Sequence, residues 1–584
     1  MGRRVVQYSG VENGLSLEHP VTRDAEPDDG RPAANAHRVM VIGLDGAGFD
    51  VIGGLLQDGR MPNLARLQET GASGTLRSIY PPISAIAWPS FYTGVGPGKH
   101  AVFGFSHFHP ATYGRTLANA RSVAFPTIWD LASARERRSV IANVPMTYPP
   151  APLNGVLVSG LLAPHPRSRF TYPDALRDEL AAEVGNLMPD PSRTRLLQRT
   201  VRGALGWLGA ATDIRTRMFL HLMRGQPWDL FVGVFRTTDV TQHAFLGKAV
   251  RSPEPPYEMV RRGGHIIAGH YEHVDAAIGK LVAEAPADTS FVVMSDHGAN
   301  VKKQSLFTNE WLADRGLLRW ARWPLFGESG GAVKHVTVGR QLQSLRIAWL
   351  GKLLPKHWLD REITIPRESS ILHMGRSIDW AQTRAFCDPT MPEGIRINLR
   401  GRERDGTVEP GEECERVVSD IIQAAGETAA EDGEEPIVKI ARREELYAGP
   451  YVADAPDLVL ITEDLSVRRE PCRRGYLRPA RGLLRAGHSS DGIVVASGPA
   501  FASLDEPVSA SIVDLAPTIL YLLGVPVPEE ADGRVLTELL RPEVTAGREI
   551  EYAAHGEATR RRAPEPTEPP DERVMKRLRD LGYL

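Results

Sequence analysis

Short apolar runs recur along the chain and alternate with helical patterns, which leaves few folds open to it. The runs are R-V-M-V-I-G-L (38–44), D-L-F-V-G-V-F (229–235), T-S-F-V-V-M (289–294), D-L-V-L-I (457–461) and G-I-V-V-A-S (492–497). Runs of this kind are typical of strands buried in a parallel sheet. Helical patterns separate them, such as the one from Pro62 and the one that ends at Gly524. The sequence therefore predicts an α/β fold with a largely parallel central sheet flanked by helices.

Changes in composition along the chain predict its division into segments. The N-terminal segment is rich in Asp, Glu, Pro, Gly and Ala and poor in apolar residues, which is typical of disorder. A charged, turn-rich region predicts a smaller α+β cap. The expected segments are a disordered leader (1–37), the first part of an α/β core (38–325) with a helical insertion (about 161–225), a cap or insertion (326–480), the second part of the core (481–545), and a linker with a C-terminal tail (546–584).

Charge and cysteine content exclude several classes of protein. A net charge of −3 over 584 residues gives no general attraction to nucleic acid, so we expect no specific nucleic acid partner. Cys387, Cys414 and Cys472 are widely spaced and form no C-x-x-C pair, which indicates a reducing compartment. No apolar run approaches the ~18 residues of a transmembrane segment, and the N-terminus lacks the apolar core of a secretory signal. We expect a cytoplasmic protein, and nothing in the sequence bears on its oligomeric state.

Acidic and histidine side chains follow three of the predicted strands. Asp45 follows the first run, Asp239 and His243 follow the second, and Asp296 and His297 follow the third. Because ligands of open α/β sheets bind at the carboxyl ends of the strands, we expect these side chains to converge. Asp239 and His243 are four residues apart, so they share a helix face and can ligate one ion.

His488, which precedes the last apolar run, is a further candidate ligand. With it the set comprises three carboxylates and three imidazoles, which are oxygen and nitrogen donors of borderline hardness. This donor set predicts binding of divalent metal, with Zn²⁺ the best match and Mn²⁺ or Fe as alternatives.

A candidate nucleophile lies in the stretch Y-P-P-I-S-A-I-A-W-P-S-F-Y-T-G-V-G-P-G-K-H, which spans residues 80–100. Its two leading prolines prevent a helix from starting before Ile83, so Ser84 falls at or near a helix N-terminus. The unpaired N–H groups and the dipole at that position favour an anion, which suits a serine that carries a phosphoryl group. Judged without the rest of the chain, a serine at this position is also typical of an ordinary helix N-cap, which is the alternative interpretation.

The motifs occur in an order that resembles a known family. They are V-I-G-L-D-G, M-P-N-L-A-R-L, P-P-I-S-A-I-A-W-P-S-F-Y-T-G, P-G-K-H, N-V-P-M-T-Y-P-P, T-T-D-V-T-Q-H, M-S-D-H-G, A-G-H and V-D-L-A-P-T-I-L-Y-L-L-G-V-P-V-P, over about residues 38–545. This series resembles the alkaline phosphatase superfamily and, within it, the bacterial type I phosphodiesterase/nucleotide pyrophosphatase family. The resemblance implies an alkaline-phosphatase-like sandwich and a Ser84 nucleophile. It also implies two metal sites, one held by Asp45, Ser84, Asp296 and His297 and the other by Asp239, His243 and His488.

Two departures from related patterns narrow the expected activity. Nucleotide pyrophosphatases of this group have an Asn shortly after H-G-I, whereas Phe105 stands at that position here. Nucleotide recognition therefore stays open. Sulfatases require Cys or Ser followed by x-P-x-R, but Ser84 is followed by A-I-A-W, which argues against a sulfatase.

These features predict a two-metal hydrolase of phosphodiester or pyrophosphate bonds that acts through a covalent phosphoserine. A small anionic phosphate ester is the expected substrate. A phosphomonoesterase and a phosphotransferase with an alcohol acceptor are alternatives on the same scaffold. A non-catalytic metal-binding scaffold is a further alternative, against which the intact set of seven candidate residues argues.

An arginine-rich run precedes His488. Between Val467 and His488 the chain has seven arginines and one acidic residue, Glu470. A solvated basic loop is the simplest interpretation of such a run. Its place beside a candidate ligand instead indicates a basic rim for an anionic substrate, with Arg473, Arg474 and Arg478 as candidate binding residues.

Overall fold

The computed structural model describes most of the chain, and the account below concerns those residues alone. They are 37–163, 168–185, 187, 193–247, 265–321, 333–337, 362–366, 378–428, 439–462, 464–472, 475–480, 485–554, 574 and 578. The expected leader lies outside them apart from His37, as does most of the expected C-terminal tail.

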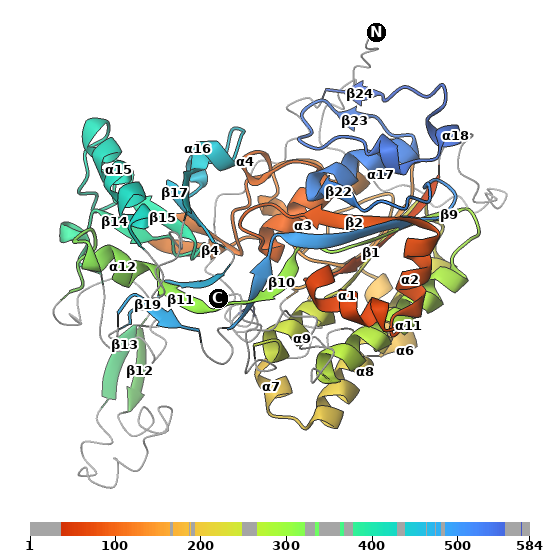
Figure 1. Cartoon of the computed structure of the whole chain (residues 1–584), viewed down its shortest axis with the longest axis horizontal. Coiled ribbons are helices and arrows are strands. Elements are labelled where there is room, and N and C mark those ends of the chain that lie inside the picture. Colours follow the sequence, from red (N-terminus) through yellow and green to blue (C-terminus); the bar gives the residue numbers. More distant parts are fainter. Residues whose placement is uncertain are drawn as a thin grey trace.

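Nine strands in the described part of the chain form one central sheet (Figure 1). Seven of them run in the same direction, and β21 and β7 run antiparallel to their neighbours. The largely parallel sheet expected from the sequence is therefore confirmed. In spatial order the strands are β22 (Val508–Ser511), β2 (Gly71–Arg77), β21 (Asp491–Ser497), β9 (Thr289–Met294), β1 (Arg38–Leu44), β8 (Leu230–Phe235), β5 (Ser139–Val144), β6 (Gly155–Ser159) and β7 (Thr171–Tyr172).

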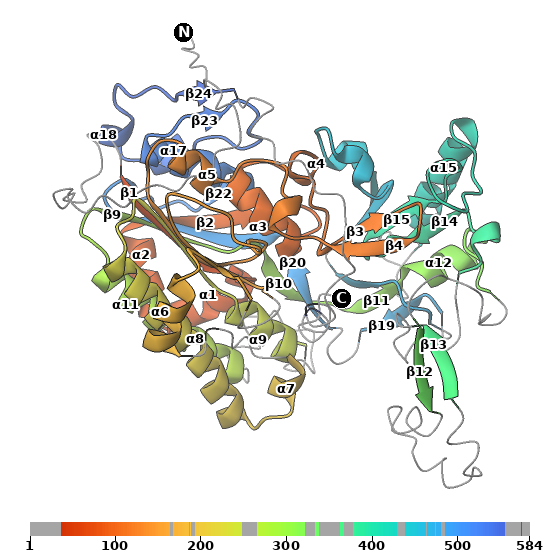
Figure 2. The ribbon, with the colours of Figure 1, turned by 180° about the vertical axis from the view of Figure 1, so that it is seen from behind.

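Helices cover both faces of this sheet because successive strand residues point to opposite sides. On β1, Val39 and Val41 belong to one apolar cluster and Met40 and Ile42 to the other. The first face carries α3 (Ser84–Thr93), α5 (Ile128–Ser133) and α17 (Leu515–Leu523). The opposite face carries α1 (Phe49–Gln57), α2 (Pro62–Glu69), α6 (Leu176–Val184), α8 (Val201–Gly225) and α11 (His265–Glu284). Figure 2 shows the same layers from behind.

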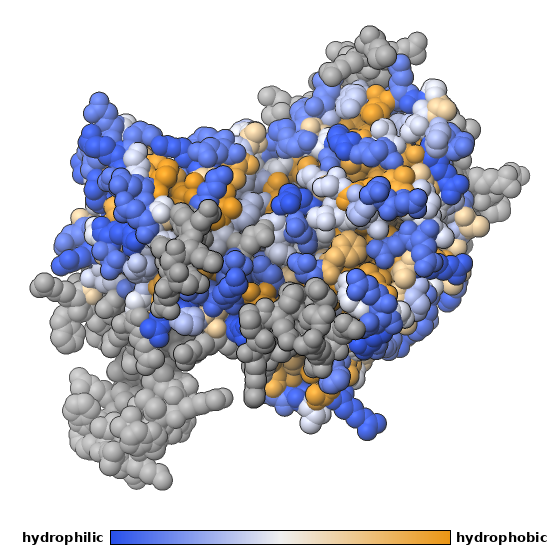
Figure 3. Space-filling view, viewed as in Figure 1, coloured by the Kyte–Doolittle hydropathy of each residue, from blue (hydrophilic) through white to orange (hydrophobic). Residues whose placement is uncertain are grey.

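A smaller lobe lies beside the sheet (Figure 1). Its four-stranded antiparallel sheet consists of β14 (Ala385–Cys387), β15 (Gly394–Ile397), β17 (Leu458–Ile461) and β16 (Lys439–Arg442), and α15 (Glu412–Gly426) packs on it. Hydrophilic residues predominate over α15 on the face shown in Figure 3. The prediction that the run 457–461 is a buried parallel strand is wrong, because β17 pairs antiparallel within the smaller lobe.

Residues that precede position 326 in the sequence also form part of the smaller lobe. A second sheet of three strands holds β11 (Gln304–Phe307) between β18 (Leu465–Arg468) and β19 (Leu477–Pro479), and α12 (Thr308–Asp314) follows β11. Leu306 and Trp311 belong to the same apolar cluster as Phe386. The hairpin of β3 (Ser106–His109) and β4 (Gly114–Leu117) reaches this cluster through Phe108 and Tyr113.

Short elements complete the described chain. They are α4 (Pro97–His100), α7 (Arg193–Leu197), α9 (Thr237–Phe245), α16 (Arg443–Leu446), α18 (Pro542–Thr545), β10 (Gly298–Val301) paired with β20 (Ala486–Ser489), β12 (Val333–Thr337) paired with β13 (Glu362–Pro366), and β23 (Val527–Pro528) paired with β24 (Tyr552–Ala553). The range 161–225, where a helical insertion is expected, contains α6, α7 and α8 together with β7 of the central sheet. None of the described helices is long and apolar enough to cross a membrane.

Candidate active site

Ser84 is the first residue of α3, as the sequence predicts. The preceding Ile83 is extended, with φ −114° and ψ 131°, and its carbonyl accepts the first helical bonds from Ile86 and Ala87. The side chain of Ser84 is fully buried. The helix ends at Gly94, whose φ of 72° lies in the left-handed region. Ser84 therefore occupies the N-terminus of a helix.

Three acidic and imidazole groups surround Ser84. Its Oγ lies 3.2 Å from Asp45 Oδ1 and 3.1 Å from His297 Nε2. His297 Nε2 lies 3.3 Å from Asp296 Oδ2, and the other oxygen of Asp296 accepts a hydrogen bond from Gly46 N at 3.0 Å. Asp45 directly follows β1, and Asp296 and His297 follow β9, the strand beside it. The three residues form the first cluster of candidate ligands.

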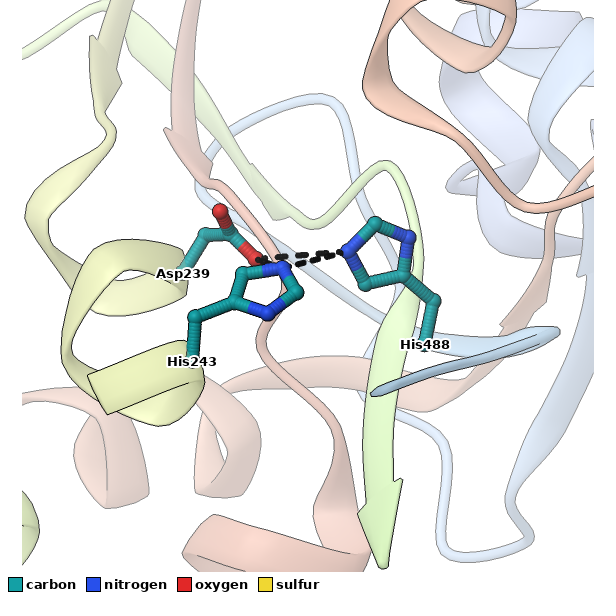
Figure 4. A group of neighbouring side chains, drawn as sticks. All are labelled: Asp239, His243 and His488. Carbon is teal, nitrogen blue, oxygen red and sulfur yellow. Dashed lines mark hydrogen bonds and ion pairs between the residues drawn. The ribbon is translucent and has the colours of Figure 1, made fainter. Parts of the chain in front are cut away.

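Asp239, His243 and His488 form the second cluster, in which the side chains point toward one another (Figure 4). Asp239 and His243 lie one turn apart on α9, and His243 Nε2 is 3.3 Å from Asp239 Oδ1. His488 lies on β20, with its Nε2 2.8 Å from His243 Nε2 and 3.6 Å from Asp239 Oδ1. Its Nδ1 lies 2.7 Å from the carbonyl oxygen of Pro82, which orients the ring with Nε2 toward the cluster.

The two clusters adjoin each other. The rings of His297 and His488 stack with centroids 3.9 Å apart and an interplanar angle of 23°. The structure thus brings together all seven residues that the sequence singles out as nucleophile and ligands.

Burial dominates the electrostatics of the site. It raises the pKa of Asp45 well above its ordinary value, with the negative charges of Asp296 and Asp239 adding to the effect. Burial likewise raises the pKa of Asp296. It lowers the pKa of His488 to about 3, with His297 contributing. For Asp239, burial acts to raise the pKa, but the neighbouring His243 and His488 outweigh it and hold that pKa well below its ordinary value.

The residues present fit a pair of metal ions. Within each cluster the candidate ligand atoms all lie within 4.8 Å of one another. The Oδ2 atoms of Asp45 and Asp296 are buried and accept no hydrogen bond from the described residues. Two buried carboxylates this close together are suited to bind a cation, which offsets their negative charge.

One buried charge beside the clusters was not anticipated from the sequence. Arg236, fully buried between β8 and α9, has its Nε 3.5 Å from Asp45 Oδ2, and its charge lowers the pKa of Asp45 against the effect of burial. The only sequence signal was its position directly after an apolar run. His100 is also buried, and its Nε2 lies 3.0 Å from Ser90 Oγ on α3.

The arginine-rich run is only partly described. Arg473 and Arg474 lie outside the described residues. Arg478 lies on β19 of the smaller lobe, opposite Ser305 of β11. Two other arginines of the run are engaged within that lobe, Arg468 with Glu470 and Arg469 with the carbonyl oxygen of Pro389.

A mostly parallel sheet covered by helices, with this donor set at the carboxyl ends of its strands, is typical of a metal-dependent phosphoric ester hydrolase. The sequence profile of the type I phosphodiesterase / nucleotide pyrophosphatase family matches residues 39–468. The chain belongs to this family, as the order of its motifs predicts. No curated protein matches the chain in sequence.

Three solved structures are similar to the chain at low identity. Murine ectonucleotide pyrophosphatase / phosphodiesterase 5 is 12% identical over 86% of this chain and 100% of its own, with a TM-score of 0.45. An inactive form of that murine protein, in complex with AMP, has 11% identity over 86% and 100% of the two chains and a TM-score of 0.46. Phosphonoacetate hydrolase from Sinorhizobium meliloti 1021, in complex with phosphonoformate, has 14% identity over 85% and 96% and a TM-score of 0.46.

Proposed function

We propose that the protein is a two-metal hydrolase of phosphodiester or pyrophosphate bonds that forms a covalent intermediate on Ser84. The observation that carries the proposal is the position of Ser84 Oγ within 3.2 Å of Asp45 Oδ1 and His297 Nε2, at the start of α3. A small anionic phosphate ester is the proposed substrate class.

The chain's own residues account for binding and orientation. The N-terminus of α3 attracts the scissile phosphate group, since its first N–H groups and its dipole favour an anion. Ser84 Oγ attacks phosphorus, which forms an O–P bond and breaks the bond to the leaving oxygen. Water then breaks the Ser84–phosphorus bond and releases the phosphorylated product. Burial of the seryl group keeps bulk water away from the first step.

We assign the first metal site to Asp45, Ser84, Asp296 and His297 and the second to Asp239, His243 and His488. Zn²⁺ is the first candidate, and Mn²⁺ or Fe are alternatives for the same donors. Bound ions would supply positive charge that favours the Ser84 alkoxide and the charge developing on the leaving oxygen.

The first test is Ser84→Ala. We expect the variant to keep its fold and bound metal but to lose at least ~10³-fold in kcat, because a covalent catalyst is removed. Ser90→Ala is the matched control, since Ser90 is a buried serine of the same helix that bonds the carbonyl of Ile86 and His100. Normal turnover by the Ser84 variant would contradict the proposal and direct attention to Ser78, Ser90 or Thr93.

Two measurements separate the alternatives. Product analysis with an added alcohol distinguishes a phosphotransferase, which transfers phosphate to the alcohol, from a hydrolase. A screen of nitrophenyl monoesters, nitrophenyl diesters, nucleotide-sugars and sulfate esters ranks the substrate classes and shows whether monoesters are preferred. Turnover of any of these substrates excludes a purely structural role.

We also propose that the natural substrate has charge beyond the scissile group and that Arg473, Arg474 and Arg478 contribute to its binding. The proposal rests on the seven arginines that precede His488 in the sequence. Replacing the three by Ala should raise KM for a multiply charged substrate and flatten its salt dependence, while turnover of a nitrophenyl diester stays unchanged. Equal losses on both substrates would instead indicate damage to the smaller lobe.

We infer the cellular compartment of the protein from the state of its cysteine side chains. Cys387, Cys414 and Cys472 are all unpaired. Unpaired cysteines are typical of a reducing environment, so we propose a cytoplasmic location. Fractionation of the source cells tests it.

A further inference from the structure

The turn that delivers Ser84 is held by both lobes of the molecule. It comprises residues 78–83, between β2 and α3. On the side of the central sheet, Ser78 N donates to Ser490 O at 2.8 Å, and Pro82 O accepts from His488 Nδ1 at 2.7 Å. On the side of the smaller lobe, the contacts converge on Tyr80.

Tyr80 is bound to the smaller lobe through its hydroxyl. Tyr80 Oη accepts a hydrogen bond from Thr462 N at 2.9 Å and lies 3.0 Å from Leu460 O, to which it donates. Leu460 belongs to β17, and Thr462 follows that strand directly. The hydroxyl also lies 3.3 Å from Thr462 O. It therefore takes the place of a neighbouring strand at the end of β17, where it binds one N–H and faces two C=O groups.

The backbone of Tyr80 is bound to the same lobe. Tyr447 Oη donates to Tyr80 O at 3.0 Å. Burial raises the pKa of Tyr447, so its hydroxyl remains a donor at any physiological pH. Tyr447 and Val459 share an apolar cluster with Ile86 of α3, and Tyr80 packs against it. Figure 1 shows α16 and β17 at the junction with α4 and the large lobe.

The path from Tyr80 to Ser84 is short and stiff. The intervening residues are Pro81, Pro82 and Ile83. Each proline fixes its own φ, and Ile83 N donates to Pro81 O at 2.8 Å. A displacement of Tyr80 is therefore carried to Ser84 rather than absorbed by the turn.

We propose that Tyr80 is a positioning residue for Ser84, through which β17 of the smaller lobe sets the place of the nucleophile. The smaller lobe then acts on the rate of catalysis. This inference rests on the proposed role of Ser84.

Tyr80→Phe tests the inference, because it removes the hydroxyl while keeping the ring in its apolar cluster. We expect kcat to fall about 10- to 100-fold, as for other groups that orient reacting side chains. KM should change less than about two-fold, and the metal content per chain should match wild type. The rate of phosphoserine formation in a single turnover should fall in parallel with kcat.

Tyr113→Phe is the matched control. Tyr113 Oη also makes one donated and one accepted bond, to Asn398 Oδ1 at 2.9 Å and from Asp405 N at 3.1 Å, but neither partner adjoins the Ser84 turn. Its kcat should stay near wild type. Equal losses in both variants would mean a general loosening of the smaller lobe and would overturn the inference.

Tyr447→Phe provides a second approach, for use if Tyr80→Phe does not fold. It should lower kcat in the same direction, and the double variant should lose less than the product of the two effects, since both act on one turn.

An unchanged kcat for Tyr80→Phe, with Ser84→Ala inactive, overturns this inference alone. Activity of Ser84→Ala would instead remove the proposed function on which it rests.

Discussion

His488 is the residue that joins the two clusters of candidate ligands. Its ring stacks on His297 of the first cluster, and its Nε2 faces His243 of the second. The hydrogen bond from Nδ1 to Pro82 O leaves Nε2 as the candidate ligand atom. One imidazole thus helps to set the separation of the two sites and the path of the turn before Ser84.

Single histidine substitutions should therefore remove metal site by site. We expect His297→Ala and His488→Ala each to lose about one metal equivalent per chain, because each cluster is left with too few ligands. Elemental analysis after reconstitution measures the stoichiometry. His273→Ala is the control, since His273 pairs with Asp213 at 2.9 Å outside both clusters and should leave the metal content intact. A wild-type protein that binds one ion or none would contradict the two-site assignment.

The candidate ligands could be located from the sequence because each lies close before or after a recognisable apolar run or shares a helix turn with another. Asp239 and His243 illustrate this, since a spacing of four residues on one helix fixes their relative direction. Arg236 was not found because nothing in the sequence distinguishes a buried arginine from an exposed one. Its burial depends on the packing of β8 against α9, which is a property of the folded chain.

At the scale of elements, α3 packs on the sheet over a glycine of β1. A Cβ added at Gly43 of β1 would lie 2.5 Å from Trp88 Cη2 and 2.9 Å from Val234 Cγ2. The absence of a side chain at Gly43 is thus what lets Trp88, and with it α3, approach β1. The depth of Ser84 in the site follows from this contact.

Gly43→Ala should push α3 away from the sheet. We expect a loss of about 1–3 kcal/mol in the free energy of unfolding, as for other overpacked cores. The fall in kcat should exceed what that loss explains, because Ser84 moves with the helix. Chemical denaturation and steady-state kinetics measure the two effects. Gly53→Ala in α1 is the control, since no atom lies within 4 Å of its added Cβ, and it should be neutral or stabilising. Wild-type kcat in the Gly43 variant would contradict the coupling.

The strand at 457–461 shows where prediction from sequence stops at this scale. Its apolar pattern correctly predicts a strand, and Leu458, Val459 and Leu460 are fully buried. The pattern does not specify which strands are its neighbours, because apolar side chains bury equally well in either sheet. Which strands pair depends on how the chain connects them. Here the chain runs from β16 through α16 to β17, which then pairs antiparallel with β16.

At the scale of the whole molecule, the stability of the smaller lobe depends on an ion pair between Arg402 and Asp457, the residue directly before β17. Arg402 donates to both oxygens of Asp457 at 2.6 Å, and Asp457 Oδ2 also accepts from Ile397 N at 2.8 Å. Burial acts to raise the pKa of Asp457, but the hydrogen bonds and charge of Arg402 outweigh it and hold that pKa below its ordinary value.

The stabilisation by this pair should depend on pH. Because the pKa of Asp457 is lower in the folded protein, the stabilisation is present above the ordinary carboxyl pKa of about 4 and is lost as the pH falls below it. We expect Asp457→Ala to cost about 3 kcal/mol at neutral pH and progressively less in acid. Calorimetry of both proteins across pH measures the difference. Asp314→Ala, which breaks an exposed pair with Arg315, should have little effect at any pH. A pH-independent difference would contradict the assigned ion pair.

The place of β21 in the central sheet has a consequence for the order in which the molecule is made. This strand, Asp491–Ser497, lies between β2 and β9, which precede it by about 420 and 200 residues in the chain. Until a ribosome has released residue 497, both earlier strands have an open edge, and such edges invite pairing with other chains. His488 emerges with the same segment. A nascent chain therefore gains its last candidate ligand almost together with the strand that joins β2 to β9, so the second cluster is completed only when these strands can pair.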